Sequence, residues 1–184
     1  MKKINYIMLV ILLLSLSGDR SIFRYNKIKF YKSILLKNNI QKLLPGDILI
    51  KKKEAAYLEW FGHCGIVTNN YTVAEFPKIG VGFKLSPLSN WYNENRYIAV
   101  LRLKNITFKE KAIIFSNIRS TLDKKYSFLP KNSENGYYCS SFIWKMFHFN
   151  REKSILLDLD SDSGFSVWPY DILFSNELIQ IPLQ

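Results

Sequence analysis

The chain has 184 residues, of which 48% are hydrophobic and 15% aromatic, with eight glycines and a formal net charge of +11. This length suffices for one domain with a substantial core, and the composition excludes a disordered, collagen-like or linker-like protein. The sequence contains no internal repeat, no GxGxxG motif and no phosphate-binding loop, so a doubly wound nucleotide-binding fold is not expected.

The first 17 residues have the pattern of an export signal. Lys2 and Lys3 form a basic end, residues 7–16 form a short apolar core, and small residues suit cleavage before Gly18. The apolar core is shorter than the roughly 20 residues that cross a bilayer as a helix. We therefore expect an exported protein, whether periplasmic, secreted or membrane-associated. An uncleaved N-terminal anchor is the alternative.

Residues 18–42 form a basic segment that we expect to be helical. Apolar residues recur at a roughly helical period across residues 22–43, and Arg20 to Lys53 includes ten basic residues against one acid, Asp47. Such a face would attract an anionic membrane or a cell-wall polymer, although a solvated helix face has the same composition. Nucleic acid is not expected as a partner, because an exported protein would rarely meet it.

Residues 43–184 have the pattern of a single α+β domain. Turns are indicated at residues 45–47 and at Asn69-Asn70. Strands are predicted at 48–51, 62–68, 71–76 and 97–103, with a short extended piece near 80–82, and helices at 108–122 and 136–149; residues 165–184 have a mixed pattern. Because the strands come first and the helices follow, we expect a small antiparallel sheet or barrel packed with helices.

Cys139 is the candidate nucleophile. It lies in NGYYCSSFIWKMF, where a loop is expected to turn into a helix. Free backbone N–H groups and the helix dipole stabilise a thiolate at such a position, and the same N–H groups can hold the oxyanion of an acyl-transfer intermediate. The alternative is a buried, unreactive cysteine in an apolar helix.

A nucleophilic cysteine needs a base, and the chain has two histidines. His148 follows Cys139 by nine residues on the same predicted helix. That spacing puts it on the opposite side of the helix and about 13 Å along the axis. His148 therefore cannot reach Cys139, and we interpret it as a surface or packing residue. His63 is the remaining candidate base.

His63 and Cys64 are neighbours at the start of the strand predicted at 62–68. Side chains alternate along a strand, so these two should point to opposite faces, and Cys64 is better interpreted as a small core residue. Folding the chain back near residue 69 places Glu75 opposite His63, where a carboxylate can orient the imidazole. An exposed strand carboxylate is the alternative for Glu75.

Four blocks of the sequence together resemble one enzyme family. They are LLPGDILI (43–50), WFGHCGIV (60–67), KKYSFLP followed by YYCSSFIWKMF (124–147), and WPYDILFSNELIQI (168–181). In this order they resemble the permuted NlpC/P60-like cysteine hydrolases of the YiiX/YebB (YaeF) group, circularly permuted relatives of papain-like enzymes. The resemblance covers residues 43–184. The order of His before Cys distinguishes this group from ordinary NlpC/P60 proteins.

The resemblance implies an α+β fold of the circularly permuted papain-like (NlpC/P60) type and a role for each candidate residue. Cys139 would be the nucleophile, His63 the base and Glu75 the residue that orients the base. Tyr126 matches a family tyrosine near the active site, which could bind substrate or support the oxyanion, with a packing tyrosine as the alternative. The resemblance implies no metal and no organic cofactor.

The expected function is that of an exported thiol hydrolase acting on a peptide or amide bond of the cell envelope. A lipid acyl hydrolase or acyltransferase is one alternative, because the same triad serves amide, ester and thioester carbonyls. A non-catalytic envelope-binding module of the same fold is another. A disulfide between Cys64 and Cys139 would remove the free nucleophile, and the alternation of side chains argues against it.

The stretch DLDSDSG, residues 158–164, has the alternating acids of a calcium-binding loop. However, Gly164 is one position late for an EF-hand, and Pro169 stands where the bidentate Glu belongs. A polar surface loop is the better interpretation.

Overall fold

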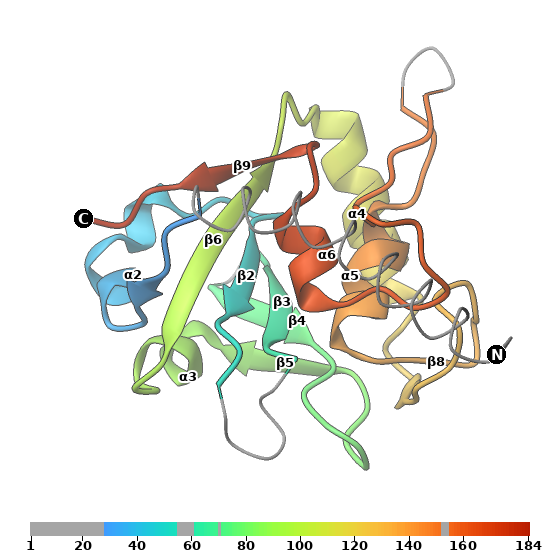
Figure 1. The fold of residues 1–184 in the computed structure, drawn as a ribbon, viewed down its shortest axis with the longest axis horizontal. Coiled ribbons are helices and arrows are strands. Elements are labelled where there is room, and N and C mark those ends of the chain that lie inside the picture. Colours follow the sequence, from blue (N-terminus) through green and yellow to red (C-terminus); the bar gives the residue numbers. More distant parts are fainter. Residues whose placement is uncertain (1–27, 55–60, 70, 152–154) are drawn as a thin grey trace, which may run out of the picture.

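The computed structural model describes residues 28–54, 61–69, 71–151 and 155–184 (Figure 1). Its centre is a seven-stranded antiparallel sheet in the order β1-β6-β2-β3-β4-β5, with β9 also paired to β6. The strands are β1 (Tyr31–Lys32), β2 (Ile48–Lys51), β3 (His63–Val67), β4 (Thr72–Glu75), β5 (Lys84–Pro87), β6 (Tyr97–Leu103) and β9 (Leu178–Ile181). The sheet is open, which confirms the α+β class and the sheet rather than the barrel.

Helices cover both faces of the sheet. The face covered by α4 (Phe108–Arg119), α5 (Cys139–Phe147) and α6 (Pro169–Leu173) holds the larger buried cluster. The other face packs against α2 (Leu35–Asn38) and α3 (Leu88–Tyr92). A 3-10 turn, η1 (Ile40–Lys42), follows α2, and β7 (Lys125–Tyr126) pairs in parallel with β8 (Gly136–Tyr137). Figure 1 shows α4, α5 and α6 grouped apart from α2 and α3.

Strand β2 carries consecutive apolar residues because both faces of the sheet are covered. In β2, Ile48 and Ile50 belong to the cluster on the α5 side, whereas Leu49 belongs to the cluster on the α3 side. All three side chains are fully buried. Unbroken apolar runs are typical of strands that bury both faces, which explains why ILIK shows no alternation of polar and apolar residues.

Helix α5 is held on the sheet by its apolar face. Phe142 and Phe147 are fully buried, and the Phe142 ring contacts Phe76, which follows β4, at 5.2 Å between centroids. Removing a buried phenylalanine side chain costs about 3–5 kcal/mol of stability. This packing fixes the position of the helix start, where Cys139 lies.

The predicted helix at 22–43 is wrong within the described residues. Tyr31 and Lys32 pair with the first residues of β6, and the Ser33 N–H continues this contact by donating to the Arg96 carbonyl at 2.7 Å. Only one turn of α-helix and one of 3-10 helix follow. Pairing with an available sheet edge outweighs the weak helical period of this stretch. Residues 22–27 lie outside the described ranges.

The other predicted elements are confirmed with small shifts of their ends. The helix expected at 108–122 ends at Arg119, and it begins at a capping box in which Thr107 and Glu110 each accept the other's backbone N–H. The helix expected at 136–149 begins only at Cys139. The extended piece expected near 80–82 lies slightly later, as β5.

No helix in the described part of the chain is long and apolar enough to cross a membrane. The predicted export signal, residues 1–17, lies outside the described ranges. The division into a signal, a basic segment at 18–42 and a domain at 43–184 stays a prediction.

Candidate active site

Cys139 is the first residue of α5. Tyr138 before it is extended (φ −104°, ψ 170°), and its N–H donates to Ser141 Oγ at 2.9 Å. Ser140 Oγ donates to the Val167 carbonyl at 2.8 Å, which ties the helix start to the C-terminal segment. The first N–H groups of a helix have no intrahelical acceptor. The thiol therefore stands where those N–H groups and the positive end of the helix dipole favour a thiolate.

His63 and Glu75 form the hydrogen-bonded pair that was expected. His63 Nε2 lies 2.7 Å from Glu75 Oε2, and both side chains are largely buried. Their register differs from the prediction, however, because β3 pairs with β4 through Ile66 opposite Ala74. Continuing that register puts Glu75 opposite Gly65 rather than His63. The two side chains thus meet diagonally on one face of the sheet.

Gly65 explains how the diagonal pair fits. A Cβ at this position would lie 2.5 Å from Val73 Cγ1 and 3.0 Å from Trp91 Cζ2. The space that a side chain would fill is occupied by the Trp91 indole, and the His63 ring stacks on that indole at 5.4 Å between centroids. Trp91 and Gly65 therefore fix the plane of the imidazole, a role that the sequence did not suggest.

The hydrogen bonds of the site set its charges. Burial alone would lower the pKa of His63, but hydrogen bonds to Cys139 and Glu75 raise this pKa to about 9. Burial would raise the pKa of Glu75, but the hydrogen bond from His63 and a second from Ser86 lower it. The favoured state is an imidazolium held between a carboxylate and a thiolate.

Cys64 lies against Cys139. The strand alternation places it away from His63, as predicted, and it is fully buried in the cluster on the α5 face. A hydrogen bond from Cys64 is the largest cause that lowers the pKa of Cys139 well below its usual value, with burial opposing it and the hydrogen bond to His63 adding to it. Burial raises the pKa of Cys64 itself, so Cys64 stays a protonated donor.

The prediction that side-chain alternation keeps Cys64 away from Cys139 is wrong, because both lie in one buried cluster. It assumed that Cys64 faces away from Cys139, whereas α5 packs on the same face of the sheet to which Cys64 points. Both cysteines are nevertheless free thiols. The sequence predicts the alternation of side chains but not which face the helix covers.

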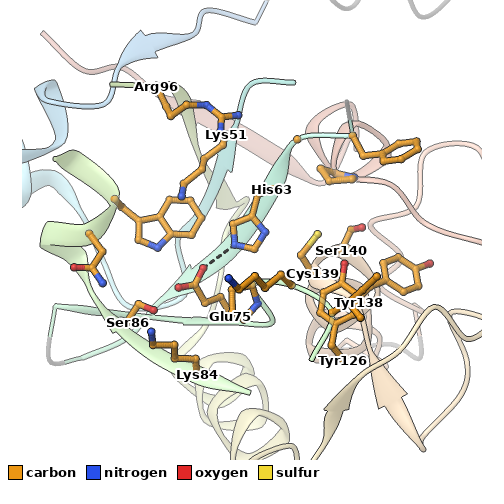
Figure 2. Close-up of a pocket in the computed structure, with 18 of the residues that line it drawn as sticks. Lys51, His63, Glu75, Lys84, Ser86, Arg96, Tyr126, Tyr138, Cys139 and Ser140 are labelled. Carbon is orange, nitrogen blue, oxygen red and sulfur yellow. Dashed lines mark hydrogen bonds and ion pairs between the residues drawn. The ribbon is translucent and has the colours of Figure 1, made fainter. Parts of the chain in front are cut away.

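A cavity of about 660 Å³ opens at this site. Its lining includes Cys139, His63, Glu75 and Tyr126. Figure 2 shows Cys139 and Tyr126 on one side of His63 and Glu75 on the other. A volume of several hundred cubic ångströms is typical of a small-molecule or peptide site.

Tyr126 lies on β7 with its ring against Phe128, 5.3 Å between centroids. Burial and the nearby Cys139 thiolate raise its pKa, so the phenol stays neutral and can donate a hydrogen bond. Its predicted role in binding substrate or the oxyanion stays a prediction.

His148 lies at the other end of α5, where its ring stacks on Trp144 at 4.2 Å between centroids. It is absent from the lining of the cavity, which agrees with its predicted packing role. In the stretch 158–164, Asp160 forms an ion pair with Lys131, and its Oδ1 accepts the N–H groups of Asp162 and Ser163. In this turn the Asp160 carboxylate is therefore bound by backbone N–H groups and by a lysine of the same chain.

Comparison with known proteins identifies the family. The model of the permuted papain-like amidases (YaeF/YiiX, C92 family) matches residues 35–182, which is most of the chain. The chain belongs to this family. Membership supports an amide hydrolase of papain-like type and confirms the suspected YiiX/YaeF relationship. No curated protein matches the chain.

A solved structure shows the same fold. The protein described as metalloprotein yiiX from Escherichia coli O157:H7 is similar with a TM-score of 0.54 and 18% sequence identity. The match covers 76% of this chain and 97% of that chain. At this level of identity the likeness shows the fold alone. It agrees with the family assignment and with a papain-like arrangement of helices on an antiparallel sheet.

Proposed function

We propose that this chain is an exported cysteine hydrolase that cleaves an amide or peptide bond of the cell envelope with Cys139, His63 and Glu75. The observation that carries the proposal is the 2.7 Å contact between His63 and Glu75 in the same cavity as the thiol at the start of α5. Membership of an amidase family supports the reaction class. The envelope and export rest on the sequence of residues 1–17.

The proposed reaction has two halves. The Cys139 thiolate attacks the amide carbon and forms a C–S bond, while the backbone N–H of Cys139 holds the oxyanion. The His63 imidazolium then gives its proton to the leaving amine as the C–N bond breaks. Water attacks the thioester, His63 accepts the water proton, and the acid leaves with regeneration of the thiolate. Glu75 keeps the imidazole oriented and its positive charge stabilised throughout.

The alternatives differ in substrate or in activity. One alternative is a lipid acyl hydrolase or acyltransferase, which would use the same three residues. The other is a non-catalytic envelope-binding module, and the aromatic side chains around the cavity favour the lipid enzyme over it. The basic segment at 18–42 stays a candidate for anionic membrane or wall polymer, with Lys29, Lys32 and Lys37 exposed.

A resident metal does not fit the residues present. The related yiiX is described as a metalloprotein, and in the described part of this chain one group of three candidate ligands exists, Asp160, Asp162 and Asp171. Asp160 is already paired with Lys131, and Asp171 accepts the Trp168 N–H at 2.6 Å. These carboxylates are satisfied by protein donors, so the proposed mechanism has no step through a metal.

The test is turnover of a panel of N-acyl amides and peptides by the wild type and by Cys139→Ala. We expect the wild type to release amine and to show a thioester adduct on Cys139 by intact mass spectrometry. Cys139→Ala should lose both signals. Equal turnover by Cys139→Ala, or labelling of another residue, would contradict the proposal. Cys64→Ser should keep the adduct on Cys139, which establishes that the neighbouring thiol is not the site of the adduct.

A further inference from the structure

Five aromatic side chains form a continuous wall along one side of the cavity. The ring centroids of successive neighbours lie 4.5 Å (Phe61–Trp168), 6.5 Å (Trp168–Tyr138), 5.7 Å (Tyr138–Phe128) and 5.3 Å (Phe128–Tyr126) apart. All five line the cavity. Tyr138 directly precedes Cys139 in the sequence, so this aromatic wall runs past the thiol.

Three side chains of the aromatic wall are exposed, whereas Tyr138, which lies between Trp168 and Phe128, is buried at 3% exposed. Phe61 is 54% exposed, Phe128 61% and Trp168 37%. Single exposed apolar residues are ordinary, but a contiguous group at a cavity marks a surface that binds an apolar partner. The cavity therefore offers an apolar site on the Cys139 side.

The lining of the cavity also carries charged side chains. Its lining holds four basic residues other than His63 and two acids, namely Lys51, Lys78, Lys84, Arg96, Glu75 and Glu94. The ion pairs Lys51–Glu94 (2.6 Å) and Arg96–Glu54 (2.8 Å) neutralise two of the cations. The Glu75 carboxylate is bound by His63.

Two lysines of the lining lie outside these ion pairs. Lys78 and Lys84 form no ion pair with any acid in the described residues. Lys84 is directly opposite Glu75 in the β4–β5 register, which puts it beside the carboxylate end of the His63 pair. Figure 2 shows Lys84 on the Glu75 side of His63, away from Cys139 and Tyr126.

The proposed mechanism indicates which part of the substrate, the acyl group or the leaving amine, lies on each side of the cavity. His63 must protonate the amine that leaves, so the leaving amine lies on the His63 side of the scissile bond. The acyl group stays bound to Cys139 and lies along the aromatic wall. An amine that approaches past His63 meets Lys84, which lies on the Glu75 side.

We infer that the cavity selects amides that join an apolar acyl group to an amine carrying a carboxylate, the chemistry of N-acyl amino acids. This inference rests on the proposed hydrolase function. The aromatic wall binds the acyl group, and Lys84 binds the carboxylate. Hydrolysis adds water across the C–N bond and releases a carboxylic acid and a free amino acid. The apolar acyl group can be a fatty acyl chain or an apolar amino-acid residue.

Three decanoyl amides test the effect of charge on the leaving amine. Decanoyl-glycine is negatively charged, decanoyl-glycinamide is neutral, and the decanoyl amide of ethylenediamine is positively charged. We expect kcat/KM to fall in that order, with about a tenfold step from glycine to glycinamide, as for the loss of one charge-assisted hydrogen bond. Lys84→Glu should reverse the order. Lys109→Glu, an exposed lysine outside the cavity lining, is the matched control and should keep it.

The acyl side is tested with decanoyl-glycine, N-acetyl-phenylalanyl-glycine and acetyl-glycine. We expect the first two to exceed acetyl-glycine, and whichever leads identifies the natural acyl source as lipid or peptide. Phe128→Ala should reduce the preference for the apolar acyl group about tenfold. Phe108→Ala is the matched control, because Phe108 is 90% exposed on α4 and does not line this cavity.

The outcomes separate the inference from the proposed function. If hydrolysis depends on Cys139 but proceeds equally for the three amines, or if Lys84→Glu leaves their order unchanged, the inference fails and the hydrolase stands. If no amide of either series is hydrolysed in a Cys139-dependent manner, both fail.

Discussion

Each end of helix α5 carries a titratable side chain, and the helix dipole alone does not explain the pKa shifts of these two groups. At the N-terminal end the pKa of Cys139 is lowered, as the dipole favours. At the C-terminal end the dipole favours a cation, yet the pKa of His148 is lowered, chiefly by burial. Two ends of one helix thus differ in what surrounds the ionisable group.

The difference lies in the hydrogen-bond partners. Cys139 has Cys64 and His63 as side-chain partners, and His63 has Glu75. His148 stacks on Trp144, and its Nδ1 is buried without a hydrogen-bond partner among the described residues. A buried group keeps its charge only where neighbours hydrogen-bond the charged form. The hydrogen-bond network, more than the dipole, therefore sets the charge of the titratable group at each end of α5.

The largest expected effect separates the two histidines. His63→Ala should lower kcat/KM about 10²- to 10⁴-fold, because it removes the proton donor and acceptor of the reaction. His148→Ala should stay within about twofold. Both variants are assayed on the best amide of the panel, with circular dichroism to establish that they fold. Similar losses in both would break the distinction between the two ends of the helix.

The pH profile of turnover should follow the charges of the N-terminal network. As pH rises through about 9, His63 loses the proton that it must give to the leaving amine, so kcat/KM falls. As pH drops below the lowered pKa of Cys139, the thiolate is protonated and kcat/KM falls again. A bell-shaped profile is expected from stopped assays across pH 4–11. An alkaline limb near pH 6.5, the ordinary histidine value, would contradict the ion pair.

Gly65→Ala tests the support beneath His63. The added methyl would collide with Val73 and Trp91, and overpacking of this kind lowers the free energy of unfolding by about 1–3 kcal/mol. Urea unfolding measures the loss. The double variant with Val73→Ala should recover part of it, because the closest contact is removed. Additive effects of the two changes would argue against that contact.

The hydrogen bond from Cys64 is tested through the pKa of Cys139, of whose lowering it is the largest cause. Cys64→Ala should raise the pKa of Cys139, because it removes one hydrogen bond to the thiolate. Thiolate absorbance at 240 nm, which then reports Cys139 alone, measures the shift. Cys64→Ser keeps a donor and should lie between the wild type and Cys64→Ala. An unchanged pKa in Cys64→Ala would remove Cys64 from the network.

Local pattern was sufficient for much of the fold and for the candidate triad. The strand at 97–103 and the helix beginning near residue 108 follow from apolar periodicity and capping residues. Helical geometry excluded His148, and strand alternation separated His63 from Cys64. Bringing His63 and Glu75 together needed only a short hairpin, although its register differs from the prediction by two residues, with Glu75 opposite Gly65 rather than His63.

What the sequence could not predict depends on contacts between distant segments. Trp91 lies in a short helix within LSNWY, a stretch without clear periodicity, and its role arises only where it packs against His63 across Gly65. The contact of Cys64 with Cys139 depends on which face α5 covers. The aromatic wall gathers Phe61, Phe128 and Trp168 from three separate regions of the chain.

The most direct test of the central claim is the rate at which iodoacetamide alkylates Cys139 as a function of pH, in the wild type and in His63→Ala. Peptide mapping assigns the modified residue. The account predicts rapid alkylation of the wild type well below the ordinary cysteine pKa of about 8.5, and a profile that moves up towards that value in His63→Ala. An unshifted profile in His63→Ala, or a wild-type Cys139 that reacts only as an ordinary thiol, would contradict it.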